Sequence, residues 1–211
     1  MKPTFMFKSL QVVARIWTTL MFDLKVFGAH RVPDEGGVLL ISNHQSYLDP
    51  VLLGVRLRRP LSYLAKSELF TNKAFSWLIR SLGAFPVRQG AGDVGAMRET
   101  IARLQEGHAL NVYPEGSRTE NGQLQPIEKG VALVIRKAKV PVVPVVIQGS
   151  YDAWPKCRKI FRPHPIQVYY GQPVDFSSLD REQVIQTIDR LFHDMIAELR
   201  AGKVPMDGRE H

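Results

Sequence analysis

Residues 42–50 read Ser-Asn-His-Gln-Ser-Tyr-Leu-Asp-Pro and follow an apolar run, residues 37–41, that is typical of a buried strand. Proline is favoured at the first position of a helix and disfavours helical backbone in the residue before it. The stretch therefore predicts a strand, a turn, and a helix that begins at Pro50 with Asp49 at its N-cap. Units of this kind are the building blocks of α/β folds.

His44 and Asp49 in this stretch are a candidate general base and the carboxylate that orients it. Residues five apart on a helix do not face one another, so the pair needs the turn to bring the two side chains together. The alternative is that Asp49 only caps the helix and His44 is an ordinary polar residue at a strand end. These two residues alone favour neither interpretation.

A length of 211 residues indicates one domain, or one domain with a small appendage. The net charge of +8 favours anionic partners such as nucleic acid, anionic lipid or phosphorylated substrates. The single cysteine, Cys157, excludes an internal disulfide and a multi-cysteine metal site, and no zinc or EF-hand spacing is present. A membrane span needs about 18 consecutive uncharged apolar residues, and the sequence contains no such run.

Residues 5–24 are predicted to form a helix, because apolar residues recur at spacings of three and four. Aromatic residues widen this stripe, and Lys2, Lys8 and Arg15 add positive charge, which favours a helix lying in a membrane interface. The alternative is a helix that simply packs on the domain. We therefore expect an N-terminal amphipathic membrane-associating segment at 1–28 and a second unit at 29–211.

The rest of the chain alternates between predicted strands and helices, which favours a mixed, largely parallel central sheet flanked by helices. Pro141 and Pro144 predict an edge strand or an irregular entry for the strand that contains them. Ser178 is expected to cap the terminal helix and Gly202 to end it. The other expected strands are 61–66, 83–88, 109–113, 141–147 and 166–170, and the other helices are 50–57, 68–82, 92–105 and 127–139.

Three groups of polar side chains fall at the ends of predicted strands, and ligands of open α/β sheets gather beyond the carboxyl ends of strands. Basic side chains at such positions suit a phosphate group, although each one alone is more typical of a solvated surface charge. A turn that contains Gly116 and Ser117 also leaves backbone N–H groups open to an anion. The three groups are His44 with Asp49, Lys66 with Arg88, and Glu115 to Arg118.

Four blocks of the chain resemble the ordered motifs of the glycerolipid acyltransferase family, and most of all its 1-acyl-sn-glycerol-3-phosphate acyltransferase branch. They are Asn43-His44 with Asp49 five residues after the histidine, residues 83–88, residues 113–118, and residues 140–145. Their order and spacing make the resemblance specific, and it covers about residues 30–175.

The resemblance implies that His44 is the base and Asp49 its partner. It implies that Arg88, Glu115, Gly116 and Arg118 bind the acceptor and its phosphate, and that Lys66 stands at a commonly basic position. Ser117 replaces the more usual threonine, Tyr113 a frequent phenylalanine, and Gln89 a frequent second arginine.

The implied reaction moves a fatty acyl group from a thioester to the free hydroxyl of lysophosphatidate, giving phosphatidate, with no resident cofactor and no protein nucleophile. The co-substrate is acyl-CoA or acyl-carrier protein. The alternatives are a sibling acyltransferase for another lysolipid or hydroxylated amphiphile, and a non-catalytic basic membrane-binding module. The charge also allows a nucleic-acid binder, but no helix-turn-helix or aromatic RNA-binding motif supports one. We expect a peripheral or monotopic protein on the cytoplasmic face of a membrane.

Overall fold

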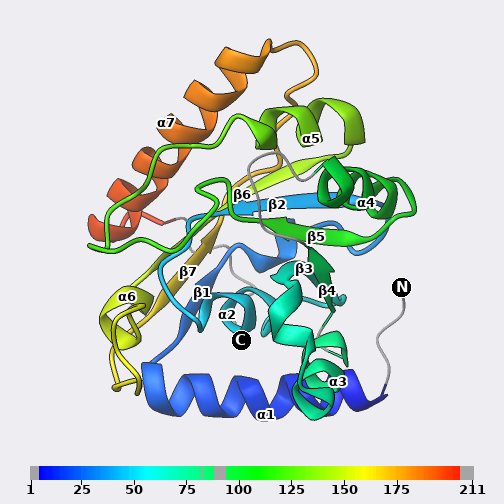
Figure 1. Ribbon diagram of the computed structural model, residues 1–211. Helices are drawn as coiled ribbons and strands as arrows, with labels where there is room; N and C mark the ends of the chain where they lie inside the picture. The colour runs from blue at the N-terminus through cyan, green and yellow to red at the C-terminus, as the bar shows by residue number, and fades with distance from the viewer. Residues whose placement is uncertain (1–4, 82, 88–93, 205–211) are drawn as a thin grey trace.

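A computed structural model describes residues 5–81, 83–87 and 94–204, and Figure 1 shows a sheet between two layers of helices. Among these residues seven strands form one sheet in the order β1-β7-β6-β2-β5-β3-β4. The strands are β1 (Lys25–Phe27), β2 (Val38–Ser42), β3 (Leu61–Lys66), β4 (Ala84–Val87), β5 (Ala109–Val112), β6 (Val142–Gln148) and β7 (Gln167–Tyr170). Every pairing is parallel except that of β6 with β7. The predicted mixed, largely parallel fold is confirmed.

Helices cover both faces of this sheet (Figure 1). They are α1 (Phe5–Phe22), α2 (Asp49–Gly54), α3 (Lys73–Ser81), α4 (Val94–Gln105), α5 (Gly130–Ala138), α6 (Ser150–Ala153) and α7 (Arg181–Arg200). The expected helix at 68–82 is divided into a 3-10 turn, Ser67–Phe70, and α3; a second 3-10 turn spans Ala29–Arg31. None of the helices among the described residues is long and apolar enough to cross a membrane.

Strand β2 lies inside the sheet between β5 and β6 and is buried on both faces. Val38 and Leu40 belong to the hydrophobic cluster shared with α1 and α2, whereas Leu39 and Ile41 belong to the cluster shared with α4, α5 and α7. Successive side chains of a strand point to opposite faces, so a continuous apolar run is needed where both faces are covered. This explains the apolar sequence that precedes His44.

Three local predictions were wrong. Helix α2 begins at Asp49, one residue early, with Leu48 at its N-cap. Asp180, not Ser178, caps α7. Its carboxylate accepts the N–H groups of Glu182 and Gln183. The side-chain oxygen of Gln183 accepts the N–H of Asp180, which completes a capping box.

Strand β6 is internal despite Pro144, so the first of the two expected alternatives, an edge position, is wrong. The second, an irregular entry, agrees with the start of the strand, where Val142 forms an isolated bridge with Val174. The pairing of β6 with β7 begins at Val145, one residue further on. Pro144 therefore lies opposite Gly171, where it only accepts a hydrogen bond, from the N–H of Gly171 at 2.8 Å. Opposite residues of such a pair normally exchange two bonds, so the proline keeps the acceptor half of this pair and gives up the donor half.

Candidate active site

The carboxyl end of β2 delivers His44 into a turn that the side chain of Asp49 organises. One oxygen of Asp49, Oδ2, lies 2.8 Å from Nδ1 of His44 and accepts the backbone N–H groups of Gln45 and Ser46 at 2.7 and 2.8 Å. The carboxylate thus binds the backbone of the turn that precedes it and does not cap α2. A purely capping role for Asp49, the alternative considered above, is excluded by these contacts.

Ser150 holds the other oxygen of Asp49. Its hydroxyl donates to Oδ1 at 2.8 Å, and both side chains are fully buried. Ser150 begins α6 directly after Gly149, whose φ of +89° suits glycine and whose added Cβ would meet the carbonyl oxygen of Pro165 at 2.2 Å. A buried charge needs hydrogen bonds to replace its lost water, and the four donors around Asp49 supply them.

Asn43 joins the turn to the neighbouring strand. Its buried side-chain amide donates to the carbonyl of Ile147 and accepts the N–H of the same residue, at 2.9 and 2.8 Å. The amide therefore continues the pairing of β2 with β6 beyond the end of the backbone ladder. His44 is fixed from both sides, by Asn43 before it and by the turn to Asp49 after it.

The loop after β5 wraps around His44. The N–H of Thr119 donates to the carbonyl of His44 at 2.9 Å, and the Tyr113 ring stacks on the imidazole with 3.7 Å between centroids and 12° between planes. The side chain of His44 keeps 18% of its surface exposed. Because Nδ1 is engaged by Asp49, Nε2 is the nitrogen left for a reacting group.

Arg118 in this loop lies close to the same turn. Its guanidinium carbon is 3.5 Å from the centre of the Tyr47 ring, and its Nη1 is buried without a hydrogen-bond partner among the described residues. An unpaired buried donor on a cation is an incomplete anion site. Gly116 and Ser117 are exposed in the same loop, and Gly116 has a φ of +70° that suits glycine.

Glu115 is the one buried residue among 115–118, and its Oε1 is unpaired among the described residues. Burial raises the pKa of its carboxyl to about 8, the backbone N–H groups of His44 and Gln125 oppose the shift, and the charge of Asp49 adds to it. The Glu115 carboxyl is therefore largely protonated at neutral pH.

The structure thus brings His44, Asp49 and residues 115–118 together at the carboxyl ends of β2 and β5, as the sequence predicted. Lys66 is the last residue of β3, but its side chain lies outside what the structure describes, and Arg88 lies outside the described residues. Sequence reasoning missed Ser150. The signal that was available is its position, since it follows the carboxyl end of β6 as His44 follows that of β2.

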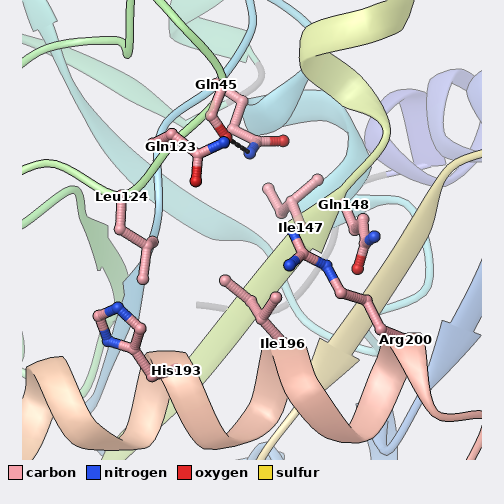
Figure 2. A pocket seen from close by; sticks show the side chains of 9 residues that line it. Gln45, Gln123, Leu124, Ile147, Gln148, His193, Ile196 and Arg200 are labelled. Atoms are coloured by element: carbon pink, nitrogen blue, oxygen red, sulfur yellow. Dashed lines mark hydrogen bonds between the residues drawn. The ribbon is translucent and has the colours of Figure 1, made fainter.

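A hollow of about 150 Å³ lies on the α7 side of this turn (Figure 2). Gln45, the residue after His44, forms part of its wall and donates from its side chain to the carbonyl of Gly122 at 3.1 Å. Figure 2 shows His193, Ile196 and Arg200 of α7 on the opposite wall. Gln45 thereby links the turn to the loop after β5, whose residues 122–124 line the hollow, whereas Arg118 does not line it.

The raised pKa of Glu115 predicts a pH-dependent difference in stability between the wild-type protein and Glu115→Gln. An unfolded glutamate ionises near 4.5, whereas folded Glu115 holds its proton up to about pH 8. The wild-type free energy of unfolding should therefore fall relative to that of Glu115→Gln as pH rises from 4.5 to 8, by about 1.4 kcal/mol for each unit of pKa difference. Urea unfolding of both proteins across this range measures it; parallel pH curves would contradict the assignment.

Comparison with known proteins places this geometry in a family context. The crystal structure of the 1-acyl-sn-glycerophosphate (LPA) acyltransferase from Thermotoga maritima matches with a TM-score of 0.79 and 28% identity, over 92% of this chain and 80% of that chain. The 1-acyl-sn-glycerol-3-phosphate acyltransferase of Bacillus subtilis (strain 168) is 25% identical over 92% of this chain and 96% of its own length.

The human 1-acyl-sn-glycerol-3-phosphate acyltransferase alpha is 31% identical over 88% of this chain and 66% of its own length. The family model described as Acyltransferase matches residues 23–148, more than half of the chain. This span includes the whole turn from Asn43 to Asp49 and the loop from Tyr113 to Thr119. The chain therefore belongs to the acyltransferase family.

Proposed function

We propose that this protein transfers a fatty acyl group from a thioester to the free hydroxyl of lysophosphatidate and so forms phosphatidate. The observation that carries the proposal is the His44–Asp49 pair at 2.8 Å, with Asp49 buried and His44 partly exposed. The names of the relatives support the choice of substrate, since the bacterial and human proteins above are called acyltransferases of 1-acyl-sn-glycerol-3-phosphate.

His44 acts as the general base. Asp49 holds the Nδ1 side of the ring, which fixes the proton on Nδ1 and leaves Nε2 to accept the proton of the acceptor hydroxyl. The carboxylate also stabilises the imidazolium that forms. Tyr113 covers one face of the ring and limits its rotation.

The acyl group moves in a direct transfer. As His44 takes the proton, the acceptor oxygen attacks the thioester carbonyl, a C–O bond forms, and collapse of the tetrahedral intermediate breaks the C–S bond. The imidazolium then returns the proton to the leaving thiolate. The step needs no protein nucleophile and no resident cofactor; the thioester of acyl-CoA or acyl-carrier protein is the co-substrate.

The acceptor phosphate is held by the loop after β5. Arg118 supplies charge through a guanidinium whose Nη1 has no partner among the described residues, and Gly116 and Ser117 are exposed in the same loop. The N–H of Gly116 donates to the carbonyl of Tyr113 at 3.0 Å, so it is not one of the open donors that the sequence predicted. Neutral Glu115 donates from its carboxyl instead of repelling the phosphate. Lys66 and Arg88 complete this group in the proposal. Holding the phosphate orients the hydroxyl toward Nε2 of His44.

The His44→Ala variant tests the base directly. Purified wild-type and variant proteins are incubated with palmitoyl-CoA and lysophosphatidate, and phosphatidate is followed by mass. We expect the variant to lose about 10²- to 10⁴-fold in turnover, as is typical of a lost general base. Turnover near wild type would reject the role of His44. Absence of product from both proteins, repeated with acyl-carrier protein and a panel of lysolipids, would reject the reaction.

The Arg118→Ala variant tests the phosphate site. Removal of a charge-assisted contact should raise the KM for lysophosphatidate by about tenfold or more and leave the KM for palmitoyl-CoA little changed. Arg190→Ala, which removes an exposed arginine of α7, is the matched control. An unchanged dependence on lysophosphatidate concentration would remove Arg118 from the site.

The proposal includes docking of the 1–28 segment on a membrane at its cytoplasmic face. Helix α1 buries Thr18 and Phe22 against the domain, but exposes a row of apolar side chains on its other side. The exposed fractions reach 56% at Ile16 and 74% at Leu20, and Val12 and Val13 are exposed beside them. A contiguous exposed apolar surface of this kind is typical of lipid or protein contact. Lipid is favoured because the proposed substrates reside in membranes.

A double variant, Ile16→Gln with Leu20→Gln, tests this docking. Loss of two large apolar side chains should weaken co-sedimentation with vesicles of phosphatidylcholine and phosphatidylglycerol by about tenfold or more. The control is Leu133→Gln on α5, because Leu133 is 41% exposed on a helix of the opposite layer. Binding of the double variant that equals that of the control would contradict docking through α1.

A further inference from the structure

A basic groove of about 750 Å³ runs along the open edge of the sheet at β1. Its walls come from α1, the turn after α2 and the residues that end α7 and follow it. None of the described residues that line it carries a carboxylate, and its basic members are Arg15, Lys25, His30, Arg56 and Arg58. The strands β7 and β6 separate this edge from β2, which carries His44.

Gln11 holds two of these cations together. Its side-chain amide donates to the carbonyls of Gly54 and Leu57 at 2.9 and 2.7 Å, which fixes α1 against the turn that contains Arg56. Arg15 follows Gln11 by one helical turn, so it lies on the same side of α1. The pKa of the Arg56 guanidinium is lowered, mainly by burial and further by the positive charge of Arg15.

The groove leaves these two arginines without a counter-charge. Neither Arg15 nor Arg56 forms an ion pair with any described residue, and the Nε of Arg56 is buried without a hydrogen-bond partner. Lys25 and Arg58 do pair, with Asp23 at 3.7 Å and Asp34 at 3.3 Å, but these pairs are exposed and therefore weak. Two like charges held together with an unmet donor form a site that an anion would complete.

We propose that this groove binds the phosphate of an anionic phospholipid headgroup, at a site separate from the one around His44. Phosphate matches the planar fork of a guanidinium with two of its oxygens. Lipid is the source that the position favours, because Arg15 lies on the helix whose other side exposes Ile16 and Leu20. The site depends on lipid contact by α1 and is independent of acyl transfer.

The test compares two single variants, Arg15→Gln and Arg56→Gln, their double variant, and Arg56→Lys. Binding is measured by co-sedimentation with phosphatidylcholine vesicles with and without phosphatidylglycerol. We expect the double variant to lose about tenfold in binding to the anionic vesicles and little in binding to phosphatidylcholine. Arg136→Gln on α5, an exposed arginine of the opposite layer, is the matched control and should bind as wild type does.

Arg56→Lys separates a built site from diffuse attraction. A guanidinium site predicts that Arg56→Lys loses nearly as much binding to anionic vesicles as Arg56→Gln does. Diffuse attraction depends only on charge, so it predicts that Arg56→Lys binds as wild type does. That second result would overturn the proposal. Arg15 is exposed, so Arg15→Gln keeps the test open if Arg56 variants fail to fold. The second measurement titrates the protein with inorganic phosphate in the absence of vesicles. If wild type binds free phosphate and Arg56→Gln does not, the assignment to lipid is overturned.

Phosphatidate formation, assayed in neutral detergent micelles, distinguishes this proposal from the proposed function. Neither arginine belongs to the site around His44, so both variants should keep wild-type turnover there. Weaker anionic-vesicle binding with unchanged turnover supports the groove. A tenfold loss of turnover in micelles would place the arginines in the acyltransferase site and overturn a separate headgroup site.

Discussion

The turn at the end of β2 depends on one buried carboxylate. Asp49 receives the His44 imidazole, the backbone N–H groups of Gln45 and Ser46, and the hydroxyl of Ser150. Without water to solvate it, this carboxylate is stable only when these donors keep their places. The direction of the His44 ring, the path of the chain into α2 and the approach of α6 are consequently set by the same group.

The other contacts of the site support this arrangement from neighbouring strand ends. Asn43 ties the turn to the end of β6, and the Thr119 N–H ties the loop after β5 to the backbone of His44. Parallel strands end at one edge, so loops far apart in sequence meet there. Arg118 lies near the base because its loop is bonded to the base's own backbone.

Much of this arrangement follows from sequence patterns, because local physics dictates it. The apolar run before His44 predicts a buried strand, and Pro50 predicts that a turn separates this strand from the next helix. Distant partners leave no local sign: Ser150 is separated from Asp49 by 101 residues. Local competition also misleads. Asp180 takes the cap that Ser178 could have formed, because Gln183 completes a capping box with it. The closeness of Arg15 to Arg56 also leaves no local sign, because it depends on how α1 lies against the turn after α2.

The central claim is that Asp49 fixes the His44 ring with its proton on Nδ1 and its Nε2 bare. Nitrogen-15 NMR of the histidine ring, at a pH where the imidazole is neutral, reports which nitrogen carries the proton. The account predicts the Nδ1–H form in the wild-type protein and a mixture of the two forms in Asp49→Asn, with the spectrum of the remaining chain showing that the variant is folded. A wild-type ring protonated on Nε2 would contradict the account, because the bare nitrogen would then be Nδ1, which faces Asp49 and cannot accept the proton of an acceptor hydroxyl.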